Sequence, residues 1–265
     1  MSKVQVLCAT INQNDFSLAE KMNIQTDVIF ANQNGQNQTE KKHFDTFCAQ
    51  MISTNTCGVG INRNLALMCS DADICLLADD DVRYVDGYEA LIEKAFADNP
   101  QADVLIFNLY DDTENYVIQK KFRVRWRNFM RFATYRIAVR SSAVKTRGIL
   151  FNTCFGGGCM YQSGEDTLFL RDCLDKGLKI FAVPIYIANM KKERPSTWFR
   201  GYDKKYLYDK GAACAAISGT FARLICLRLL LVKKQILKGV NMRFFEAYAV
   251  MKDGMKGYRD GRKFE

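Results

Sequence analysis

Histidine, proline and paired cysteine are scarce in this sequence, and each shortage removes a class of site or fold. His43 is the single histidine among 265 residues, which excludes a histidine-based zinc site and a Ser-His-Asp or Cys-His mechanism. Only three prolines occur, and no low-complexity tract or internal repeat stands out. The sequence therefore predicts a globular protein rather than a disordered chain or a solenoid.

The sequence also lacks paired cysteines and a targeting segment. Its ten cysteines are scattered without a CxxC pair, so their spacing does not indicate a disulfide framework. The N-terminus leads straight into an apolar run without the pattern of a signal peptide. We therefore expect reduced thiols in a cytoplasmic protein.

Positive charge is concentrated in two stretches. The net charge is +9, but residues 1–190 hold 20 basic and 22 acidic side chains, whereas residues 191–265 hold 18 basic and 7 acidic ones. Residues 120–147 carry ten further Lys or Arg and no acid. Nucleic acid, a membrane surface or a phosphorylated ligand would each fit such charge. We expect an anionic partner at the C-terminal part.

Apolar runs alternate with segments of helical periodicity through the first 190 residues. Strands are predicted at residues 4–9, 27–31, 51–53, 74–78, 104–109, 116–124, 134–139 and 178–183, the last ending at Pro184. Helices are predicted at residues 61–68, 88–97 and 165–175. This alternation predicts an α/β fold with a mostly parallel sheet flanked by helices, in which ligands bind at the carboxyl ends of the strands.

Three consecutive aspartates, Asp79, Asp80 and Asp81, directly follow the apolar run at 74–78. Their carboxylates can hold Mg²⁺ or Mn²⁺ through hard oxygen ligands, and such a cation would neutralise a nucleotide diphosphate as it leaves. A solvated acidic turn explains an isolated run of aspartates equally well. The position at the end of a predicted buried strand favours a ligand site.

Two later segments can also carry chemistry. Glu165 and Asp166 follow Gly164 at the start of a predicted helix, where a carboxylate could act as a general base or could simply favour the helix dipole. The glycines at 156–158 would let the backbone approach a ligand closely, or would form a plain turn. No Gly-Lys-Ser/Thr follows them, so a P-loop is not supported.

Together these segments resemble the family-two glycosyltransferases. Members of that family carry a G-x-x-x-A-R-N-type helix start, a strand that ends in a D-x-D motif, and a later G-E-D segment. The matching segments here are Gly58-Val-Gly-Ile-Asn-Arg-Asn, Ile74-Cys-Leu-Leu-Ala-Asp-Asp-Asp and Gly164-Glu-Asp. The resemblance covers roughly residues 1–200 and implies a GT-A domain, with a Rossmann-like sheet, that generally inverts the anomeric centre.

The resemblance also implies roles for the matching residues. Asp166 corresponds to the catalytic base, with Glu165 nearer the acceptor, and Asp81 corresponds to the metal ligand. Asp79 would lie at the metal or the donor ribose. The other donor-binding positions implied are Ala9, Thr10, Asn32, Arg63, Asn64 and Asp80. The sugar and acceptor positions implied are Gly157 and Gly158, and Trp198 fits either sugar stacking or packing.

Two departures from the family pattern affect what the resemblance implies. Asn32 stands where many relatives have an acidic residue that reads uracil, which leaves the nucleotide base open. Many relatives also supply a late histidine to the metal, and this sequence has none in that region. Asp81 and water would then have to suffice.

The C-terminal part, residues 201–265, is predicted to be a basic helical region. Its apolar run Ala212 to Leu237 is interrupted by Arg223 and Arg228, so a membrane-spanning helix is not predicted. A basic helix lying in the membrane interface and an amphipathic helix packed on the main domain both fit the pattern.

We therefore predict an inverting, Mn²⁺- or Mg²⁺-dependent transferase that uses a nucleotide-sugar, with a UDP-sugar favoured. Its acceptor would be a hydroxyl of a glycan or lipid-linked molecule in surface polysaccharide assembly. The setting would be the cytoplasm, with peripheral attachment to the inner face of the cell membrane as an option. The alternative is a module that binds nucleic acid or anionic lipid without transferase activity. No RRM, KH or helix-turn-helix signature supports nucleic acid.

Overall fold

The computed structural model describes residues 3–110, 116–190 and 201–264. The chain divides into two compact units. The sheet unit comprises residues 1–57, 61–151 and 169–194, and the helical unit comprises residues 58–60, 152–168 and 195–265. Each unit is described by itself below.

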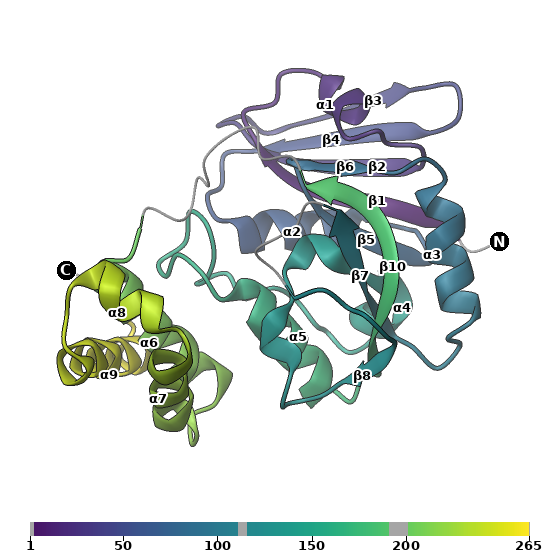
Figure 1. The fold of residues 1–265 in the computed structure, drawn as a ribbon. Helices are drawn as coiled ribbons and strands as arrows, with labels where there is room; N and C mark the ends of the chain where they lie inside the picture. The colour runs from purple at the N-terminus through teal and green to yellow at the C-terminus, as the bar shows by residue number, and fades with distance from the viewer. Residues whose placement is uncertain (1–2, 111–115, 191–200, 265) are drawn as a thin grey trace. The chain divides into compact units, whose positions relative to one another are not determined.

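The sheet unit is built on a mixed sheet with ten strands in the described part of the chain (Figure 1). Its order is β3-β4-β2-β1-β5-β9-β7-β10-β6, with β8 paired to β10. The strand bounds are β1 Val4–Ile11, β2 Asp27–Gln33, β3 Gln38–His43, β4 Cys48–Thr54, β5 Ile74–Asp79, β6 Val82–Tyr84, β7 Val104–Tyr110, β8 Phe122–Val124, β9 Ile137–Arg140 and β10 Ile180–Met190.

Most strands of this sheet run in one direction. Strands β4, β2, β1 and β5 pair in parallel, and so do β7 and β10. Strand β9 is antiparallel to both β5 and β7, which gives those two strands the same direction. The mostly parallel α/β sheet predicted from the sequence is therefore confirmed, with β3, β6, β8 and β9 running the opposite way.

Helices cover this sheet because the strand residues are apolar on both faces. The short helix α1 (Ser17–Lys21) and helix α3 (Tyr88–Ala97) share one core with the sheet, to which β1 contributes Val6 and Cys8. The intervening Leu7 and Ala9 are buried as well, as expected for strands covered on both faces. The remaining helices before residue 190 are α2 (Val59–Cys69), α4 (Ser141–Lys145) and α5 (Glu165–Asp175).

The structure differs from the predicted strands where side chains or proline override the pattern. Strand β10 does not end at Pro184 but continues to Met190. Its pairing with β7 shifts in register between Ala182 and Tyr186, because the proline between them cannot donate a hydrogen bond to the ladder. Residues 117–121 are not a strand. There the amide of Asn108 binds both the N–H and the carbonyl of Ile118. Residues 134–136 form a 3-10 turn before β9.

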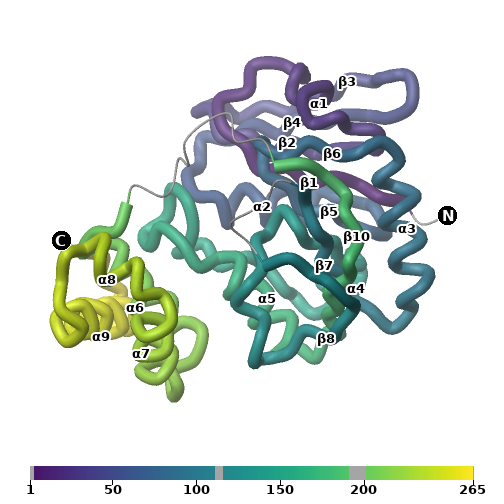
Figure 2. Tube along the Cα trace, in the orientation of Figure 1, coloured from purple at the N-terminus to yellow at the C-terminus, as the bar shows by residue number. Residues whose placement is uncertain are grey.

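The helical unit contains α6 (Lys204–Ile217), α7 (Ala222–Val232), α8 (Lys234–Val240) and α9 (Phe244–Asp260) (Figure 2). Their buried apolar side chains form a core of their own. Residues 212–237 lie in α6, α7 and α8 rather than in one helix, and their placement in a membrane interface stays a prediction. Helix α6 ends at Ile217, and the next residue, Ser218, has an extended backbone and a hydroxyl that accepts the N–H of Phe221. No described helix is both long and apolar enough to cross a membrane.

Glycines let α6 and α9 approach each other closely. A Cβ on Gly211 would meet the carbonyl oxygen of Met251, and a Cβ on Gly254 would meet that of Tyr208. Both obstacles are backbone atoms, which cannot rotate away.

We therefore expect Gly254→Ala to destabilise the helical unit by about 1–3 kcal/mol, although alanine has the higher helix propensity. Urea unfolding followed by circular dichroism measures this change. The control is Gly219→Ala, where an added Cβ meets nothing within 4 Å. Equal stability of the two variants would contradict the close crossing.

Candidate functional site

Polar side chains lie in one row across the carboxyl ends of β4, β2 and β1. Ser53, Asn32 and Thr10 are register partners on these neighbouring strands. On the other side of β1, Ala9 is the partner of Asp79 at the end of β5. Because these strands are parallel, residues far apart in the sequence meet at one edge of the sheet.

The three aspartates lie at this edge. Asp79 is the last residue of β5, and Asp80 and Asp81 form the turn into β6. The hydroxyl of Thr10 donates to Asp80 Oδ2 at 2.7 Å. All three are half-buried, and Asp81 Oδ1 is enclosed. The predicted D-x-D segment is thus held against the end of β1.

Arg63 on α2 supplies a positive charge to this cluster. Its Nη2 lies 2.7 Å from Asp79 Oδ1, and its side chain is 5% exposed. The guanidinium also lies over the Phe151 ring, 5.3 Å from the centroid. Three carboxylates and one guanidinium leave this group with a formal net charge of −2. Burial, followed by the three carboxylates, raises the pKa of the neighbouring Cys8 thiol.

Asn64, predicted to line the nucleotide pocket, holds a loop. Its Nδ2 donates to the carbonyl of Phe151 at 2.9 Å, and its Oδ1 accepts the Phe151 N–H at 2.7 Å. Phe151 in turn stacks on Phe169. This pair of hydrogen bonds fixes the ring on which Arg63 lies, so Asn64 acts on the cluster by positioning.

Asn32 is also occupied within the protein. Its side chain is fully buried. Its Oδ1 accepts the Gln13 N–H, and its Nδ2 donates to the Gln13 carbonyl at 2.8 Å and to Ser53 Oγ at 3.1 Å. The amide therefore holds the loop that follows β1. Ala9, 9% exposed, contributes the strand end rather than an open surface.

Asn62 is a site residue that the sequence analysis did not identify. It is buried on α2, and its Nδ2 donates to the carbonyls of Thr10 and Ala31 at 3.0 and 2.7 Å. It thus joins the ends of β1 and β2 to α2. Its position directly before Arg63 in the Asn-Arg-Asn segment is the sequence feature that could have identified it as a site residue.

The predicted base segment belongs to the helical unit. Glu165 begins α5, and its Oε2 accepts the N–H of Gly164 at 3.0 Å. A Cβ on Gly156 would lie 2.8 Å from the Glu165 carboxyl carbon, so this glycine allows the carboxylate to pack against the loop. Asp166 is half-buried in the first turn of the same helix.

The glycine loop closes against the first turn of α2. The Val59 N–H donates to the Gly157 carbonyl at 2.9 Å, and Phe155 forms a bridge with Tyr161. Gly158 has a φ of +74°, which a side chain would strain. Gly157 and Gly158 therefore form an ordered turn, and the predicted Trp198 lies outside the described residues.

Lys210 on α6 is a cation near the base segment that the sequence did not reveal. Burial, followed by the charge of Lys233, lowers its pKa, and the carboxylates of Glu165 and Asp166 oppose that shift. Its Nζ lies 5.3 Å from the centroid of the Tyr206 ring. The G-E-D segment therefore lies in the field of a positive charge from a helix about forty residues later in the chain.

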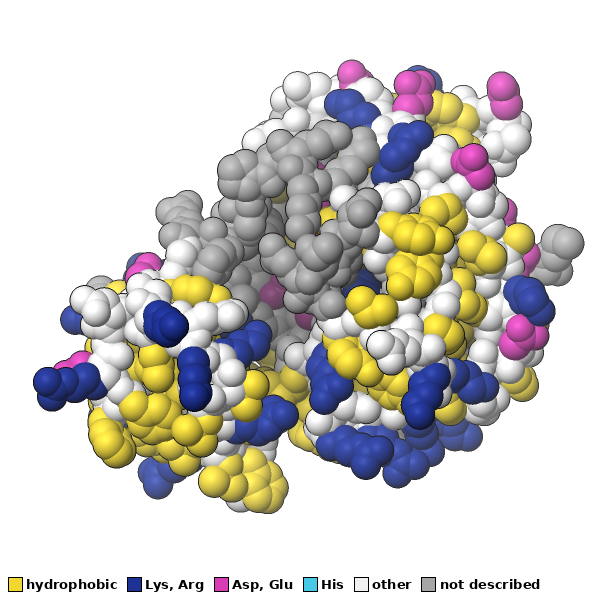
Figure 3. All heavy atoms as spheres, in the orientation of Figure 1, with side chains coloured by type: hydrophobic (Ala, Val, Ile, Leu, Met, Phe, Trp, Pro, Cys, Tyr) yellow, Lys and Arg dark blue, Asp and Glu magenta, His cyan; other side chains and the backbone are white. Residues whose placement is uncertain are grey.

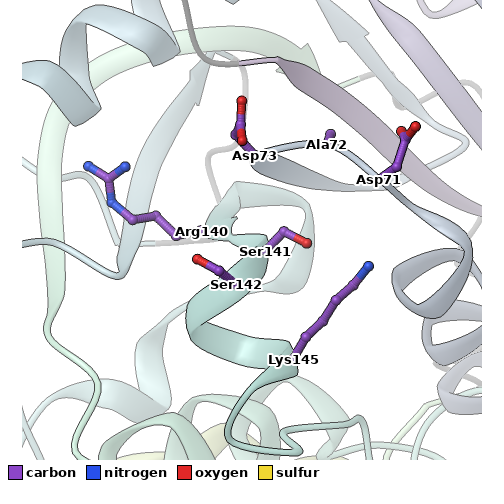
Figure 4. A pocket seen from close by; sticks show the side chains of 7 residues that line it. All are labelled: Asp71, Ala72, Asp73, Arg140, Ser141, Ser142 and Lys145. Carbon is purple, nitrogen blue, oxygen red and sulfur yellow. The ribbon is translucent and has the colours of Figure 1, made fainter.

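A hollow of about 630 Å³ lies elsewhere in the sheet unit, before the start of β5 (Figure 4). Its lining includes Asp71, Arg140, Ser142 and Lys145. Both cations are held by backbone carbonyls, Arg140 by that of Ala102 and Lys145 by that of Ser70. It is at the amino end of β5, away from the aspartate turn, and we do not assign the candidate site to it.

Comparison with solved structures identifies similar folds. S. aureus TarS 1–349 in complex with UDP-GlcNAc matches with a TM-score of 0.60 at 14% identity, over 99% of this chain and 93% of that chain. The UDP complex gives 0.62 at 14% identity with the same coverage. In the longer TarS structure, with a TM-score of 0.52, the match covers 44% of that chain. The chain thus shares the fold of these TarS structures.

No family model matches the chain. No curated protein matches it by sequence either. The likeness at 14% identity therefore concerns the fold alone.

The hydrogen bonds of Asn32 predict that an acid is not tolerated there. Asn32→Asp removes both donors and buries a carboxylate beside the Gln13 carbonyl, so we expect a loss of stability of about 2–4 kcal/mol at pH 7. The buried acid should have a raised pKa, so the loss should shrink as the pH falls towards and below the unfolded pKa of about 4.

Urea unfolding at pH 7 and pH 4.5 measures both effects. The matched control is Asn34→Asp, because the Asn34 side chain accepts the Gln36 N–H through its oxygen, a contact that aspartate can keep. A stable Asn32→Asp variant with improved UDP binding would instead support direct base reading at this position.

Proposed function

We propose that this chain is a glycosyltransferase that moves a sugar from a nucleotide-sugar to an acceptor hydroxyl. The observation that carries the proposal is the aspartate turn at the carboxyl edge of the sheet, tied to Thr10 and Arg63, in a fold shared with structures that contain UDP-GlcNAc or UDP. A UDP-sugar is accordingly the donor that we propose.

The donor site would be formed by the ends of β1 and β5. One oxygen of Asp79 binds Arg63 and one oxygen of Asp80 binds Thr10, so these two residues shape the turn. Asp81 is the residue that we assign to the metal, because it stands at the last position of the D-x-D segment, with Asp79 beside it. Ala9 and Thr10 would border the nucleoside.

The carboxylates of this turn fit Mg²⁺ or Mn²⁺ in charge and in ligand type. The formal charge of −2 on the aspartates and Arg63 matches a dication, and carboxylate oxygen is the ligand that both ions prefer. The described residues contain no group of three or more His, Cys, Asp or Glu placed to hold a metal. Mg²⁺ in nucleotide sites commonly uses one or two carboxylates and completes its shell with phosphate and water. When bound, such a cation would stabilise the leaving diphosphate.

Asp166 is the residue that we assign as the base. An inverting transfer needs one carboxylate to take the proton of the acceptor hydroxyl as its oxygen bonds to the anomeric carbon and the bond to the diphosphate breaks on the opposite face. Glu165 is engaged with the Gly164 N–H and packed on Gly156. That engagement supports a positioning role for Glu165, and Asp166 is the position that matches the base of the resembling G-E-D segment.

The acceptor class that we propose is a glycan or lipid-linked molecule, as in surface polysaccharide assembly. Gly157 and Gly158 are the residues that we assign to contacts with the sugar or the acceptor, as the resemblance implies. An anionic acceptor carrier would suit the positive C-terminal charge.

The metal assignment predicts that UDP binding depends on Mn²⁺ or Mg²⁺. Chelation with EDTA should weaken binding by at least about tenfold, equivalent to about 1.4 kcal/mol. Asp81→Asn should remove most of this dependence, whereas Asp80→Asn should change it less because Thr10 already engages Asp80. Isothermal titration calorimetry decides the matter, and equal affinity with and without EDTA would remove the metal from the proposal.

The base assignment predicts that Asp166→Asn lowers turnover by about 10²-fold or more while leaving UDP affinity unchanged. Release of UDP in the presence of donor and acceptor, together with calorimetry, separates the two quantities. The control is Glu165→Gln, which keeps an oxygen to accept the Gly164 N–H and should retain more activity. Near-normal turnover of Asp166→Asn would transfer the role to another carboxylate, with Glu165 first.

A further inference from the structure

Helix α7 exposes large apolar side chains on one face. Leu224, Leu231 and Val232 are 61%, 61% and 67% exposed, and Phe221, directly before the helix, is 60% exposed. Successive helical residues are rotated by about 100°, which places these four and the exposed Arg228 within an arc of roughly 100°. We call these five residues the α7 face.

The α7 face is not the side by which this helix joins its own core. Ala222, Cys226 and Leu230 are buried and lie on the opposite side of the helix. Helix α7 packs against α6 and α9. It therefore has apolar residues on both sides, although packing in the helical unit needs only one. Exposed apolar surface of this extent marks an interaction site.

The charged residues of the segment that carries the α7 face are all positive. Residues 218–245 contain no acidic residue. Their Lys and Arg are all exposed and are Arg223, Arg228, Lys233, Lys234, Lys238 and Arg243. Figure 3 shows hydrophobic side chains gathered over α7, with Lys and Arg near them on the helical unit.

We propose that the α7 face binds the surface of an anionic lipid bilayer. Apolar side chains would enter the boundary between headgroups and acyl chains, and the flanking cations would meet lipid phosphates. An α7 of 11 residues is about 16 Å long, far short of the roughly 30 Å hydrocarbon core. Binding would therefore be interfacial.

Charge favours this occupant over a second copy of the chain. Two α7 faces brought together would place Arg228 of one copy near Arg228 of the other, with further cations and no acid in the segment that carries the face, which is repulsive. A bilayer with anionic lipids satisfies both the apolar and the positive side chains. The proposal goes beyond the proposed transferase activity and does not depend on it.

Flotation of the full chain with lipid vesicles, without any sugar donor, tests the proposal. We expect flotation with vesicles of phosphatidylcholine and phosphatidylglycerol at about 0.1 M salt, weaker flotation at about 1 M salt because of screening, and none with phosphatidylcholine alone. The double variant Leu224→Ser/Leu231→Ser should lower the partition coefficient by at least about tenfold.

Two controls assign the binding to this face. Met68→Ser removes an apolar side chain that is 64% exposed on α2, and Arg125→Ser/Arg127→Ser removes two exposed cations from the sheet unit. Neither should reduce flotation as the α7 variant does. A further variant, Leu231→Trp, should gain a blue-shifted emission component on the anionic vesicles.

Three results would overturn the proposal. They are no flotation with anionic vesicles at low salt, unchanged flotation of Leu224→Ser/Leu231→Ser, and a loss confined to Arg125→Ser/Arg127→Ser. Circular dichroism of each variant checks that a loss of binding does not come from unfolding. Concentration-dependent dimerisation abolished by the α7 double variant would identify the face as a contact between copies instead.

Discussion

The buried guanidinium of Arg63 sets the requirement on which the rest of the carboxyl edge depends. A cation that is 5% exposed needs a counter-charge, and the structure supplies it as Asp79, the last residue of β5. The same pair makes a run of three carboxylates tolerable, because one negative charge is compensated inside the protein. The position of α2 and the geometry of the aspartate turn therefore depend on each other through this ion pair.

Three asparagine side chains fix the backbone around this ion pair. Asn62 donates to the ends of β1 and β2, Asn32 holds the loop after β1, and Asn64 holds the backbone of Phe151, whose ring lies under Arg63. Neutral amides can satisfy buried carbonyls without adding charge to a cluster that is already negative. The polar residues of this edge thus divide into charged groups suited to a ligand and amides that fix them.

Much of the fold follows from patterns that are local in the sequence. The bounds of α3 and α5 matched the prediction, because apolar periodicity and a C-terminal glycine or proline define them. Strand β3 was not predicted, because all of Gln38–His43 is exposed and strand formation there depends on pairing with β4. The break after Ile217 was missed because the apolar composition continues across it, while Ser218 and Gly219 end the helix locally.

The candidate site was less predictable than the fold, since a residue type does not tell which partner it takes. The motif located Arg63 and the aspartates, but the partners of Asn32 and Asn64 are set by residues 19 and 87 positions away. Only the assembled sheet brings those partners together. This is why a motif can find the edge of the sheet while leaving open which of its polar groups face a ligand.

The two basic stretches also show that the number of Lys and Arg residues does not tell which of them are available to a ligand. Of the ten Lys and Arg at 120–147, Arg136 donates to the carbonyl of Phe107 and to Asn108, and Arg140 and Lys145 donate to other carbonyls. These three cations serve the fold, and the other seven are exposed. In the helical unit, by contrast, every Lys and Arg between residues 218 and 245 is exposed beside apolar side chains.

Net charge alone does not distinguish nucleic acid, a membrane and a phosphorylated ligand as partners of these cations. The combination of solvated cations with exposed leucine and phenylalanine favours a partner that is both anionic and apolar, because a purely polar polyanion would leave those hydrophobic side chains in water.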